Sequence, residues 1–393
     1  MINFDFDNQC CGCFACADSC PKQCISQTKD KHGFLIPNVD KSLCIDCHKC
    51  EKVCPILKTE KQSYPERKVF SAYNKDSKIR NLGSSGSVFH AVASNIIALG
   101  GIVYGAAFQN GFTLKHISAS TLEELSPLMK SKYLQSNTLG VYKSVKSQLN
   151  KGRFVLFVGT PCQCNALYKF LGSRKPENLF IIDFICHGVP SQELFDNAIA
   201  AYEAKHLCHV EEFSFRHKLP DNTHYYILKS IGQDSQSSVH HGFFEEFPFY
   251  YGFKKYCCLR ESCYKCQFCV EDRVSDITIA DFWQLDKIDK SISKTDFNKG
   301  YSMVITNSAR GDEIIKTISS SLELQQREIG DISAINHAYS KPTKKGVYAR
   351  RFWRDYEKMT YQELEQKHLV FIPFKQLPFL RKICRYLIYK LHL

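Results

Sequence analysis

The sequence predicts two unlike folding units: a small α+β module over residues 1–60 and a mixed, largely parallel α/β domain over residues 65–340. Two observations predict them. A cysteine–proline pattern occurs twice near the N-terminus, with the second copy displaced by 34 positions. Beyond it, apolar runs of strand length alternate with helical patterns, as in α/β sheets. Residues 341–393 form a basic tail, with thirteen Lys/Arg against four Asp/Glu.

The duplicated pattern is typical of a two-cluster [4Fe–4S] ferredoxin domain. Its copies are Cys10-x2-Cys13-x2-Cys16-x3-Cys20-Pro21 and Cys44-x2-Cys47-x2-Cys50-x3-Cys54-Pro55. In such runs the fourth cysteine ligates the other cluster. We therefore expect one cluster on Cys10, Cys13, Cys16 and Cys54, and the other on Cys44, Cys47, Cys50 and Cys20. Zinc and disulfides are the alternatives, although zinc ligand pairs are usually separated by longer spacers. Two further cysteines are expected to be small apolar fillers, namely Cys11 and Cys24.

Composition is consistent with an intracellular redox protein. Twenty cysteines in 393 residues would suggest disulfides in a secreted chain, but no signal peptide is visible at the N-terminus. No stretch reaches the ~18 apolar residues of a membrane span. We expect a cytoplasmic, globular chain. Its basic balance alone would permit nucleic-acid binding, but no zinc-finger, helix-turn-helix or RNA-recognition motif supports that, and no nucleic acid partner is expected.

The elements of the second domain follow a linker-like run at 58–65. In order, we expect a strand at Val69–Tyr73, a helix over Ser87–Leu99, a strand at Ile102–Phe108, a helix near Leu139–Leu149, a strand at Phe154–Val158, a helix over Gln163–Leu171, a strand at Leu179–Ile185 and a helix near Gln192–Lys205. This alternation predicts a largely parallel sheet. Antiparallel strands are expected at Glu212–His217 and Tyr225–Ser230, with further strands at Asp276–Phe282 and Met303–Thr306.

A third cluster is predicted where two strands end in cysteine. Cys162 and Cys186 each follow an apolar strand, at the sheet edge where open α/β sheets bind ligands. The run Cys263-x2-Cys266-x2-Cys269 supplies further thiols. The preferred ligands are Cys162, Cys186, Cys263 and Cys266, and the substitutes are Cys269, Cys257 and Cys258. The alternative is that strand-end cysteines are inert packing.

A glycine–serine loop precedes the first helix of this domain. Small residues at a helix N-terminus can bind a pyrophosphate or phosphate through backbone N–H groups, although most such stretches are simple N-caps. The loop residues are Gly83, Ser84, Ser85, Gly86 and Ser87. Lys132 could add a cation and Tyr133 a stacking ring. No G-x-G-x-x-G follows a strand, so a nicotinamide-type fingerprint is absent.

Six motifs in their order along residues 65–340 resemble the coenzyme F420 hydrogenase/dehydrogenase beta-subunit family. They are Gly83–Ser87, Ser131–Ser136, Gly159–Gln163, Cys186–Ser191, Arg260-x2-Cys263-x2-Cys266 and Ser275–Trp283. The resemblance implies a flavin and iron–sulfur domain that binds FAD and a [4Fe–4S] cluster. Two positions depart from the family pattern, Ser87 and Ala280, where glycine is usual.

The resemblance implies a flavin-dependent iron–sulfur oxidoreductase that exchanges electrons with a two-electron small molecule such as F420. Many bacterial relatives are associated with surface-polysaccharide synthesis. Gly83–Ser87 and Lys132 would hold the FAD phosphates, and His187 could relay protons or could be a hydrogen-bonded structural residue. A redox partner protein or ferredoxin is expected. The rival hypothesis is an electron-transfer subunit without flavin and without catalysis.

The tail carries one further prediction. After Pro378, an apolar stripe recurs at helical spacing with Lys/Arg around it. Its residues are Leu380, Ile383, Cys384, Leu387 and Leu391. Such a helix can lie on an anionic membrane surface, or it can dock on protein.

Overall fold

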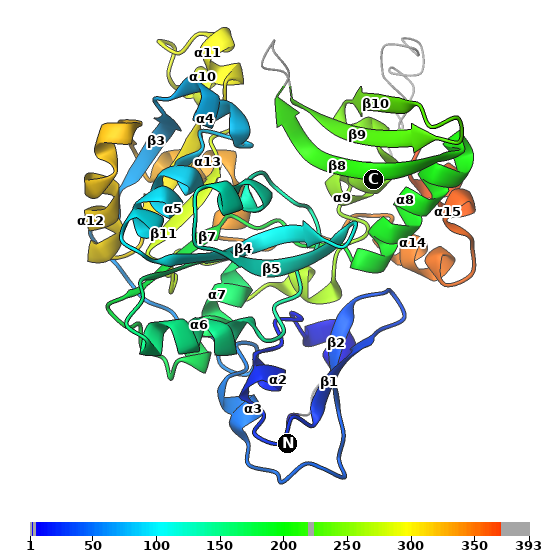
Figure 1. Cartoon of the computed structure of the whole chain (residues 1–393), viewed down its shortest axis with the longest axis horizontal. Helices are drawn as coiled ribbons and strands as arrows, with labels where there is room; N and C mark the ends of the chain where they lie inside the picture. Colours follow the sequence, from blue (N-terminus) through cyan, green and yellow to red (C-terminus); the bar gives the residue numbers. More distant parts are fainter. Residues whose placement is uncertain (1, 3–4, 219–223, 371–393) are drawn as a thin grey trace, which may run out of the picture.

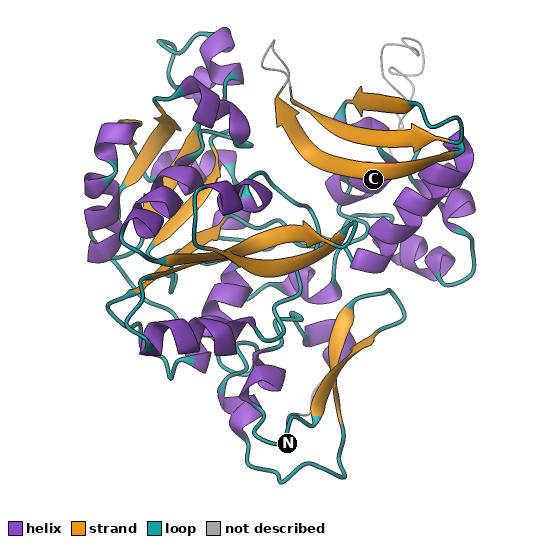
Figure 2. Cartoon of the chain, viewed as in Figure 1, coloured by secondary structure: helices purple, strands orange, loops and turns teal. Residues whose placement is uncertain are grey.

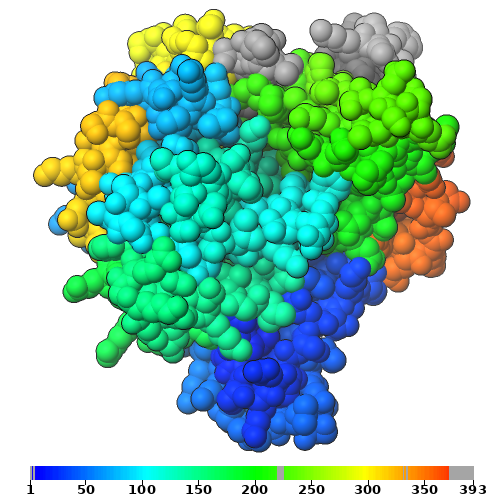
Figure 3. Space-filling view, in the orientation of Figure 1, coloured from blue at the N-terminus to red at the C-terminus, as the bar shows by residue number. Residues whose placement is uncertain are grey.

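The structure is a computed structural model of the chain, and it describes residue 2, residues 5–218 and residues 224–370. One large mixed sheet forms the centre, with helices on both faces (Figures 1 and 2). In this view the cysteine-rich module lies at the lower end, and a smaller antiparallel sheet lies at the upper right. Figure 3 shows the module in blue, packed against the rest of the molecule.

The central sheet has eight strands in the order β13-β3-β12-β11-β7-β6-β4-β5. Its four inner strands β11, β7, β6 and β4 are parallel, and every other pairing is antiparallel. The mixed α/β fold is thus confirmed, with the parallel part confined to the centre. The strands are β3 Val69–Asn74, β4 Ile102–Gln109, β5 Thr113–Ala119, β6 Val155–Gly159, β7 Leu179–Phe184, β11 Ile277–Asp281, β12 Ser302–Thr306 and β13 Leu322–Arg327.

The inner strands are apolar on both faces because helices cover both. Val155 and Phe157 pack against one pair of helices, whereas Leu156 between them packs with helices on the opposite face. This is the period of two that a strand imposes on its side chains. The first pair is α6 Val141–Asn150 and α7 Pro161–Phe170, and the opposite pair is α5 Val88–Ala98 and α12 Ala309–Thr317.

The predicted elements of this region begin and end within a few residues of the observed ones. Helix α7 begins earlier than predicted, because Thr160 caps it and Pro161 occupies its first turn, a position that needs no backbone N–H donor. Outside the cysteine-rich module, three strands of the described chain were not predicted: β5, β10 and β13. Each lies at a sheet edge. In β5 and β13, exposed polar residues interrupt the buried ones, so these strands lack the apolar run of an inner strand.

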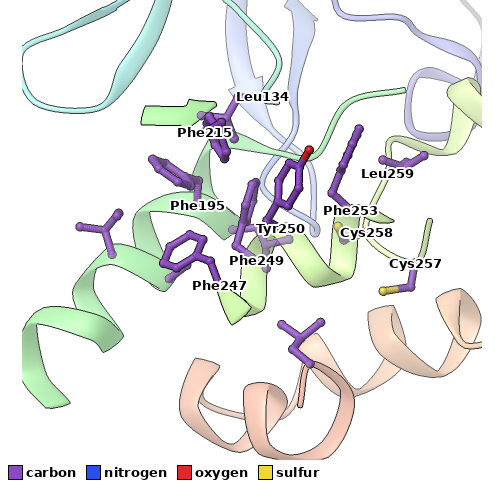
Figure 4. Packing of buried hydrophobic residues seen from close by; sticks show 14 of the residues in the cluster. Leu134, Phe195, Phe215, Phe247, Phe249, Tyr250, Phe253, Cys257, Cys258 and Leu259 are labelled. Carbon is purple, nitrogen blue, oxygen red and sulfur yellow. The ribbon is translucent and has the colours of Figure 1, made fainter. Parts of the chain in front are cut away.

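A second, antiparallel sheet packs on helices through an aromatic core (Figure 4). Its strand order is β10-β9-β8. Phe195 of α8 lies among Phe213, Phe215 and Phe249, with ring centroids 5.0–5.3 Å apart. The elements are α8 Gln192–His206, β8 Cys208–Lys218, β9 His224–Gly232, β10 Ser237–Gly242, α9 Pro248–Lys254, α14 Ala349–Tyr356 and α15 Tyr361–His368.

The described part of the basic tail belongs to this core. Phe352 and Trp353 of α14 and Leu364 of α15 are buried there, so residues 349–368 are not a free extension. The amphipathic helix predicted after Pro378 lies outside the described residues. Within the described ranges, no helix is long and apolar enough to cross a membrane.

The cysteine-rich module repeats its backbone as well as its sequence. Gly12 and Asp46 both have positive φ, and so do Phe14 and His48, again 34 positions apart. Each copy therefore turns in the same left-handed way before a short helix. The elements are α1 Phe6–Gln9, α2 Ala15–Ser19, β1 Ile25–Lys29, β2 Leu35–Val39 and α3 Lys49–Lys52.

The run expected to be a linker is instead bonded along α7. Lys169 Nζ donates to the Lys58 carbonyl at 2.8 Å, and Asn165 exchanges hydrogen bonds with the Glu60 backbone. Gln62 donates to the Tyr168 hydroxyl at 2.9 Å. The remaining short helices are α4 Ser77–Leu82, α10 Leu285–Ile288, α11 Lys294–Asn298 and α13 Gly330–Ile335, and the 3₁₀ turns are Glu123–Leu128, Phe244–Glu246, Glu261–Lys265, Ser319–Ser321 and His337–Tyr339.

Candidate metal centres and cofactor cavity

The predicted ligands of the first cluster lie together in the module core. Cys10, Cys13, Cys16 and Cys54, here called the first cysteine group, are all buried. Burial raises the pKa of Cys16, and the Cys10 and Cys54 sulfurs add to the rise. Burial also raises the pKa of Cys54, with Cys10 adding to it. A hydrogen bond with Cys11 lowers the pKa of Cys13, but burial and then the Cys16 and Cys54 sulfurs raise it overall. The four sulfurs are therefore within electrostatic reach of one another, as ligands of one cluster must be.

The second cysteine group consists of Cys20, Cys44, Cys47 and Cys50, which line one small cavity. Cys47 is exposed and Cys44 is half-buried. Cys24 also lines this cavity, with its sulfur 3.4 Å from that of Cys20. The expected apolar filler thus lies against the ligand set itself.

The third cysteine group is Cys162, Cys186, Cys263 and Cys266, whose side chains line one cavity of about 1120 Å³. Cys162 follows β6 and Cys186 follows the adjacent parallel strand β7, so both stand at the carboxyl edge of the sheet. Cys269 lines the same cavity. Cys257 and Cys258 do not: both are buried in the aromatic core (Figure 4), which corrects their place among the substitutes.

The donor chemistry of the third cysteine group fits an iron–sulfur cluster. Burial raises the pKa of Cys186 to about 12, and the Cys162 and Cys266 sulfurs add to the rise. Burial, with Cys186 and Cys266 next, raises the pKa of Cys263 well above its usual range. Crowded thiolates repel one another in a site with little water, and bound metal cations remove that repulsion.

Among the described residues, the third cysteine group does not form a site for a single metal ion. Within the part of the chain that the structure describes, no three His, Cys, Asp or Glu side chains are close enough to hold one metal ion. The thiols of this group instead line a cavity of about 1120 Å³, which has room for a multi-iron cluster. A backbone amide also faces this group, because Gly188 N–H donates to the Cys186 sulfur at 3.4 Å.

The predicted anion loop opens on the same cavity as the third cysteine group. Gly83, Ser84, Ser85 and Ser87 line it. Helix α5 begins after Ser87 without a side-chain cap, so the positive end of its dipole is not neutralised by its own chain. This loop therefore fits a phosphate group.

Gly86 has a different role from the one predicted. Its N–H already donates to Ser302 Oγ at 2.9 Å, and its carbonyl accepts from Asn74 N–H at 2.8 Å. A Cβ at this position would lie 2.2 Å from the Ala72 carbonyl oxygen. Glycine is needed because the loop approaches strand β3 closely, and Gly86 does not line the cavity.

Lys132 and Tyr133 also line this cavity. Lys132 Nζ donates to the carbonyls of Pro127 at 2.7 Å and Met129 at 2.6 Å. Burial, with the Lys130 charge second, lowers the pKa of Lys132 to about 7. One donor direction of its amino group is left for a ligand. The Tyr133 ring packs edge-on to Tyr250, with centroids 4.9 Å apart.

His187 borders the cavity with the Asn336 side chain as a polar neighbour, which raises its pKa against the effect of burial. Among the described residues, neither ring nitrogen has a partner of hydrogen-bond geometry, although both are buried. Its ring lies parallel to Tyr256 and 5.5 Å from Trp283. Burial, with His337 second, lowers the pKa of His187 to about 4. A neutral imidazole with an unused acceptor therefore borders the cavity.

Sequence reasoning missed His116, which also lines the cavity. Its Nε2 lies 2.9 Å from the Val158 carbonyl, so Nε2 must donate and Nδ1 must accept from Ser136 Oγ at 2.5 Å. Gln163 donates to the Ser136 carbonyl and accepts from Thr160 N–H. His116 lies on the unpredicted strand β5, so no sequence signal connected it to the sheet edge.

Arg216 and Asp281 were also missed, and they form an ion pair at the cavity wall. Although burial opposes it, the Asp281 carboxylate raises the pKa of Arg216. Arg216 comes from β8 and Asp281 ends β11. Asp281 lies within the Ser275–Trp283 motif, which was the available signal.

Comparison with protein families identifies both parts of the chain. Residues 9–56 match the model described as "4Fe-4S dicluster domain". Residues 152–331 match the model for the C-terminal part of the coenzyme F420 hydrogenase/dehydrogenase beta subunit. Residues 152–331 belong to this beta-subunit family. The chain is therefore an iron–sulfur protein that contains a segment of an oxidoreductase family, with [4Fe–4S] clusters in its dicluster domain.

The matched segments differ in what they contain. The beta-subunit segment includes His187 and the whole third cysteine group, and the dicluster segment includes the first and second groups. The loop 83–87 and Lys132 lie outside both segments. No curated protein matches the chain. A solved structure similar to it is the F420-reducing [NiFe] hydrogenase complex from Methanosarcina barkeri, at 16% identity and a TM-score of 0.42, covering 77% of this chain and 91% of that one.

Proposed function

We propose that this protein is a flavin-dependent iron–sulfur oxidoreductase. It passes electrons between its [4Fe–4S] clusters and a two-electron small-molecule acceptor. One observation carries the proposal: the third cysteine group and the uncapped N-terminus of α5 border a single cavity of about 1120 Å³. Bound FAD would supply the exchange between one-electron and two-electron chemistry.

The residues that would hold FAD are those that favour an anion. The N-terminus of α5 and the Ser84 and Ser85 positions would face a phosphate. Two hydrogen bonds to neighbouring segments hold the loop in place: Ser84 Oγ accepts from Ser131 N–H at 2.7 Å, and Ser85 Oγ donates to the Tyr301 carbonyl at 2.6 Å. Lys132 would add positive charge, because a bound phosphate favours its protonated form.

His187 would hold or accept a proton beside the reacting part of the acceptor. Its two ring nitrogens have no hydrogen-bond partner among the described residues, and aromatic rings beside it limit its rotation. A buried imidazole without a partner is costly unless a ligand completes it. We therefore propose that His187 hydrogen-bonds the acceptor.

The second cysteine group would be the side that meets a redox partner protein. Cys47 is exposed, and two large apolar neighbours are more than half exposed, Leu43 and Ile45 at 57% each. Apolar side chains around an exposed centre suit a transient protein contact. The resemblance implies surface-polysaccharide metabolism as one setting for this reaction, and it leaves the acceptor open.

The rival is an electron-transfer subunit that binds clusters but no flavin. One observation favours it: the proposed FAD phosphate residues lie outside both matched segments. Both hypotheses give the same iron content, so only flavin separates them. Protein purified without oxygen should show flavin absorbance and release about one FAD per chain if the enzyme hypothesis is correct.

A pair of lysine variants tests where the flavin binds. Lys132→Gln should release FAD without lowering iron, because it removes a buried positive charge from the cavity. Lys151→Gln, on the exposed residue that directly follows α6, should keep both. Unchanged FAD content in Lys132→Gln would remove Lys132 from the binding residues, and absence of FAD from the wild type would favour the rival.

A further inference from the structure

The loop that carries the first cysteine group is held by side chains of the second domain. Four consecutive backbone carbonyls of this loop, those of residues 10–13, accept hydrogen bonds from the second domain. We call this contact between the cysteine-rich module and the second domain the seam. Cys10 accepts from Arg260 at 3.2 Å and Ser262 at 3.0 Å. Cys11 and Gly12 accept from Gln135 at 2.8 and 3.2 Å, and Cys13 accepts from Thr138 at 2.7 Å. The cluster loop is thus fixed against the domain that contains the third cysteine group.

Arg260 is the charged member of this seam. It is only 1% exposed, and its guanidinium also donates to Gln135 Oε1 at 2.7 Å and to the Leu35 carbonyl at 2.8 Å. The guanidinium carbon lies 4.6 Å from the Phe34 ring centroid. Gly12 leaves room for it, since a Cβ there would lie 2.8 Å from Arg260 Nη2.

This buried charge has no carboxylate partner. Among the described residues, every hydrogen-bond acceptor of Arg260 is a neutral carbonyl or amide oxygen. Burying a charge without a counter-ion is expensive. The first cysteine group supplies negative charge beside it, because Arg260 donates to the carbonyl of Cys10, itself a predicted ligand, at 3.2 Å. A cluster held by four thiolates would supply the missing counter-charge.

The backbone of Arg260 connects the same point to the third cysteine group. Arg260 N–H donates to the Val189 carbonyl at 2.9 Å, in the loop after Cys186, and the Arg260 carbonyl accepts from Cys263 N–H at 2.9 Å. One residue therefore contacts the first cluster loop with its side chain and supports two loops of the third group with its backbone.

We propose that Arg260 is a positioning residue that sets the reduction potential of the first cluster and holds that cluster beside the third. The inference rests on the cluster assignment within the proposed function, but it requires neither FAD nor an acceptor. Reduction adds an electron to a cluster, so a fixed positive charge beside it stabilises the reduced form and raises its potential. The Arg260 side chain bonds the loop of the first cysteine group and not that of the second, so only one ferredoxin cluster should respond to it.

The test is an anaerobic redox titration of the reconstituted full-length protein, followed by electron paramagnetic resonance. In Arg260→Gln, one midpoint potential should fall while the others stay unchanged. Arg260→Lys, which keeps the charge, should stay near the wild-type potential. Lys49→Gln is the matched control, because Lys49 is an exposed charge beside the second cysteine group. It should shift a different midpoint and by less, since solvent screens it.

Unchanged potentials in Arg260→Gln with full iron content would overturn the proposal. So would an equal fall in Arg260→Lys and Arg260→Gln, because hydrogen bonding alone would then explain it. If Arg260→Gln does not hold its iron, Arg260→Lys decides: a wild-type midpoint supports the role of charge, and a lowered midpoint contradicts it. Failure of the proposed function would appear instead as wild-type protein without FAD, while Arg260→Gln still shows the lowered midpoint.

Discussion

The two halves of the cysteine module have the same ligand spacing but different surroundings. The first half lies against the second domain, with four loop carbonyls bonded across the seam. The second half faces outward, with Cys47 exposed and Leu43 and Ile45 more than half exposed. The comparison teaches that a duplicated sequence can produce two electrostatically different centres, because neighbours outside the repeat decide burial and charge.

The largest expected effect is a loss of iron, and it tests whether the first half of the module lies beside a third cluster. Two ferredoxin clusters alone would give about eight iron per chain, and a third would give about twelve. The double variant Cys263→Ser, Cys266→Ser should therefore lose about four iron and keep both ferredoxin signals. Iron analysis of the reconstituted protein measures it. A wild-type protein that saturates near eight iron per chain would mean that there is no third cluster beside the first half of the module.

Two substitutions at equivalent turns should lower the free energy of unfolding by different amounts in the two halves. Gly12→Ala should cost roughly 3 kcal/mol, because Gly12 has φ +64° and a Cβ would lie 2.4 Å from Gln135 Nε2. Asp46→Ala, 34 positions later with φ +50°, should cost about 1 kcal/mol or less, because that turn already accommodates a side chain. Thermal unfolding of both variants compares them. Equal costs would mean that the seam contributes nothing at Gly12.

Metal removal should distinguish the halves by rate. A chelator should extract iron from the second half first, with rates differing roughly tenfold, which corresponds to about 1.4 kcal/mol in the opening free energy. The physical reason is that Cys47 is exposed, whereas every member of the first cysteine group is buried. Iron release measured at successive times, together with the cluster spectra, shows which cluster is lost first. Simultaneous loss of both clusters would show that burial does not protect the inner one.

The smallest effect concerns Asp18, which caps α6 from across the seam. Its carboxylate accepts from Gly140 N–H at 2.7 Å, Tyr142 N–H at 3.0 Å and Lys143 N–H at 3.4 Å. Asp18→Ala should cost about 1 kcal/mol, as loss of a helix cap usually does. Lys52→Ala changes the equivalent position of the second half and should be near neutral. Similar melting temperatures for the two variants would argue against capping across domains.

Sequence reasoning succeeded where the chemistry is local. Cysteine spacing predicted both ferredoxin groups, and apolar runs predicted β6 and β7, whose carboxyl ends place Cys162 and Cys186 side by side. It failed where an interaction depends on distant residues. Gly86 was expected to face a phosphate, but it is needed for the approach to Ala72. His116 was not predicted, because β5 is an edge strand without an apolar run.

By itself, the sequence determined the cluster-binding module, the inner strands with the helices between them, and the cysteines that end two adjacent strands. Each follows from short-range rules of ligand spacing and side-chain periodicity. Only the tertiary structure decided that Cys257 and Cys258 lie in an aromatic core, that residues 58–65 are bonded along α7, and that Arg260 contacts the Cys10 loop. Those contacts join residues more than a hundred positions apart or depend on competition for buried space, and no local pattern specifies either.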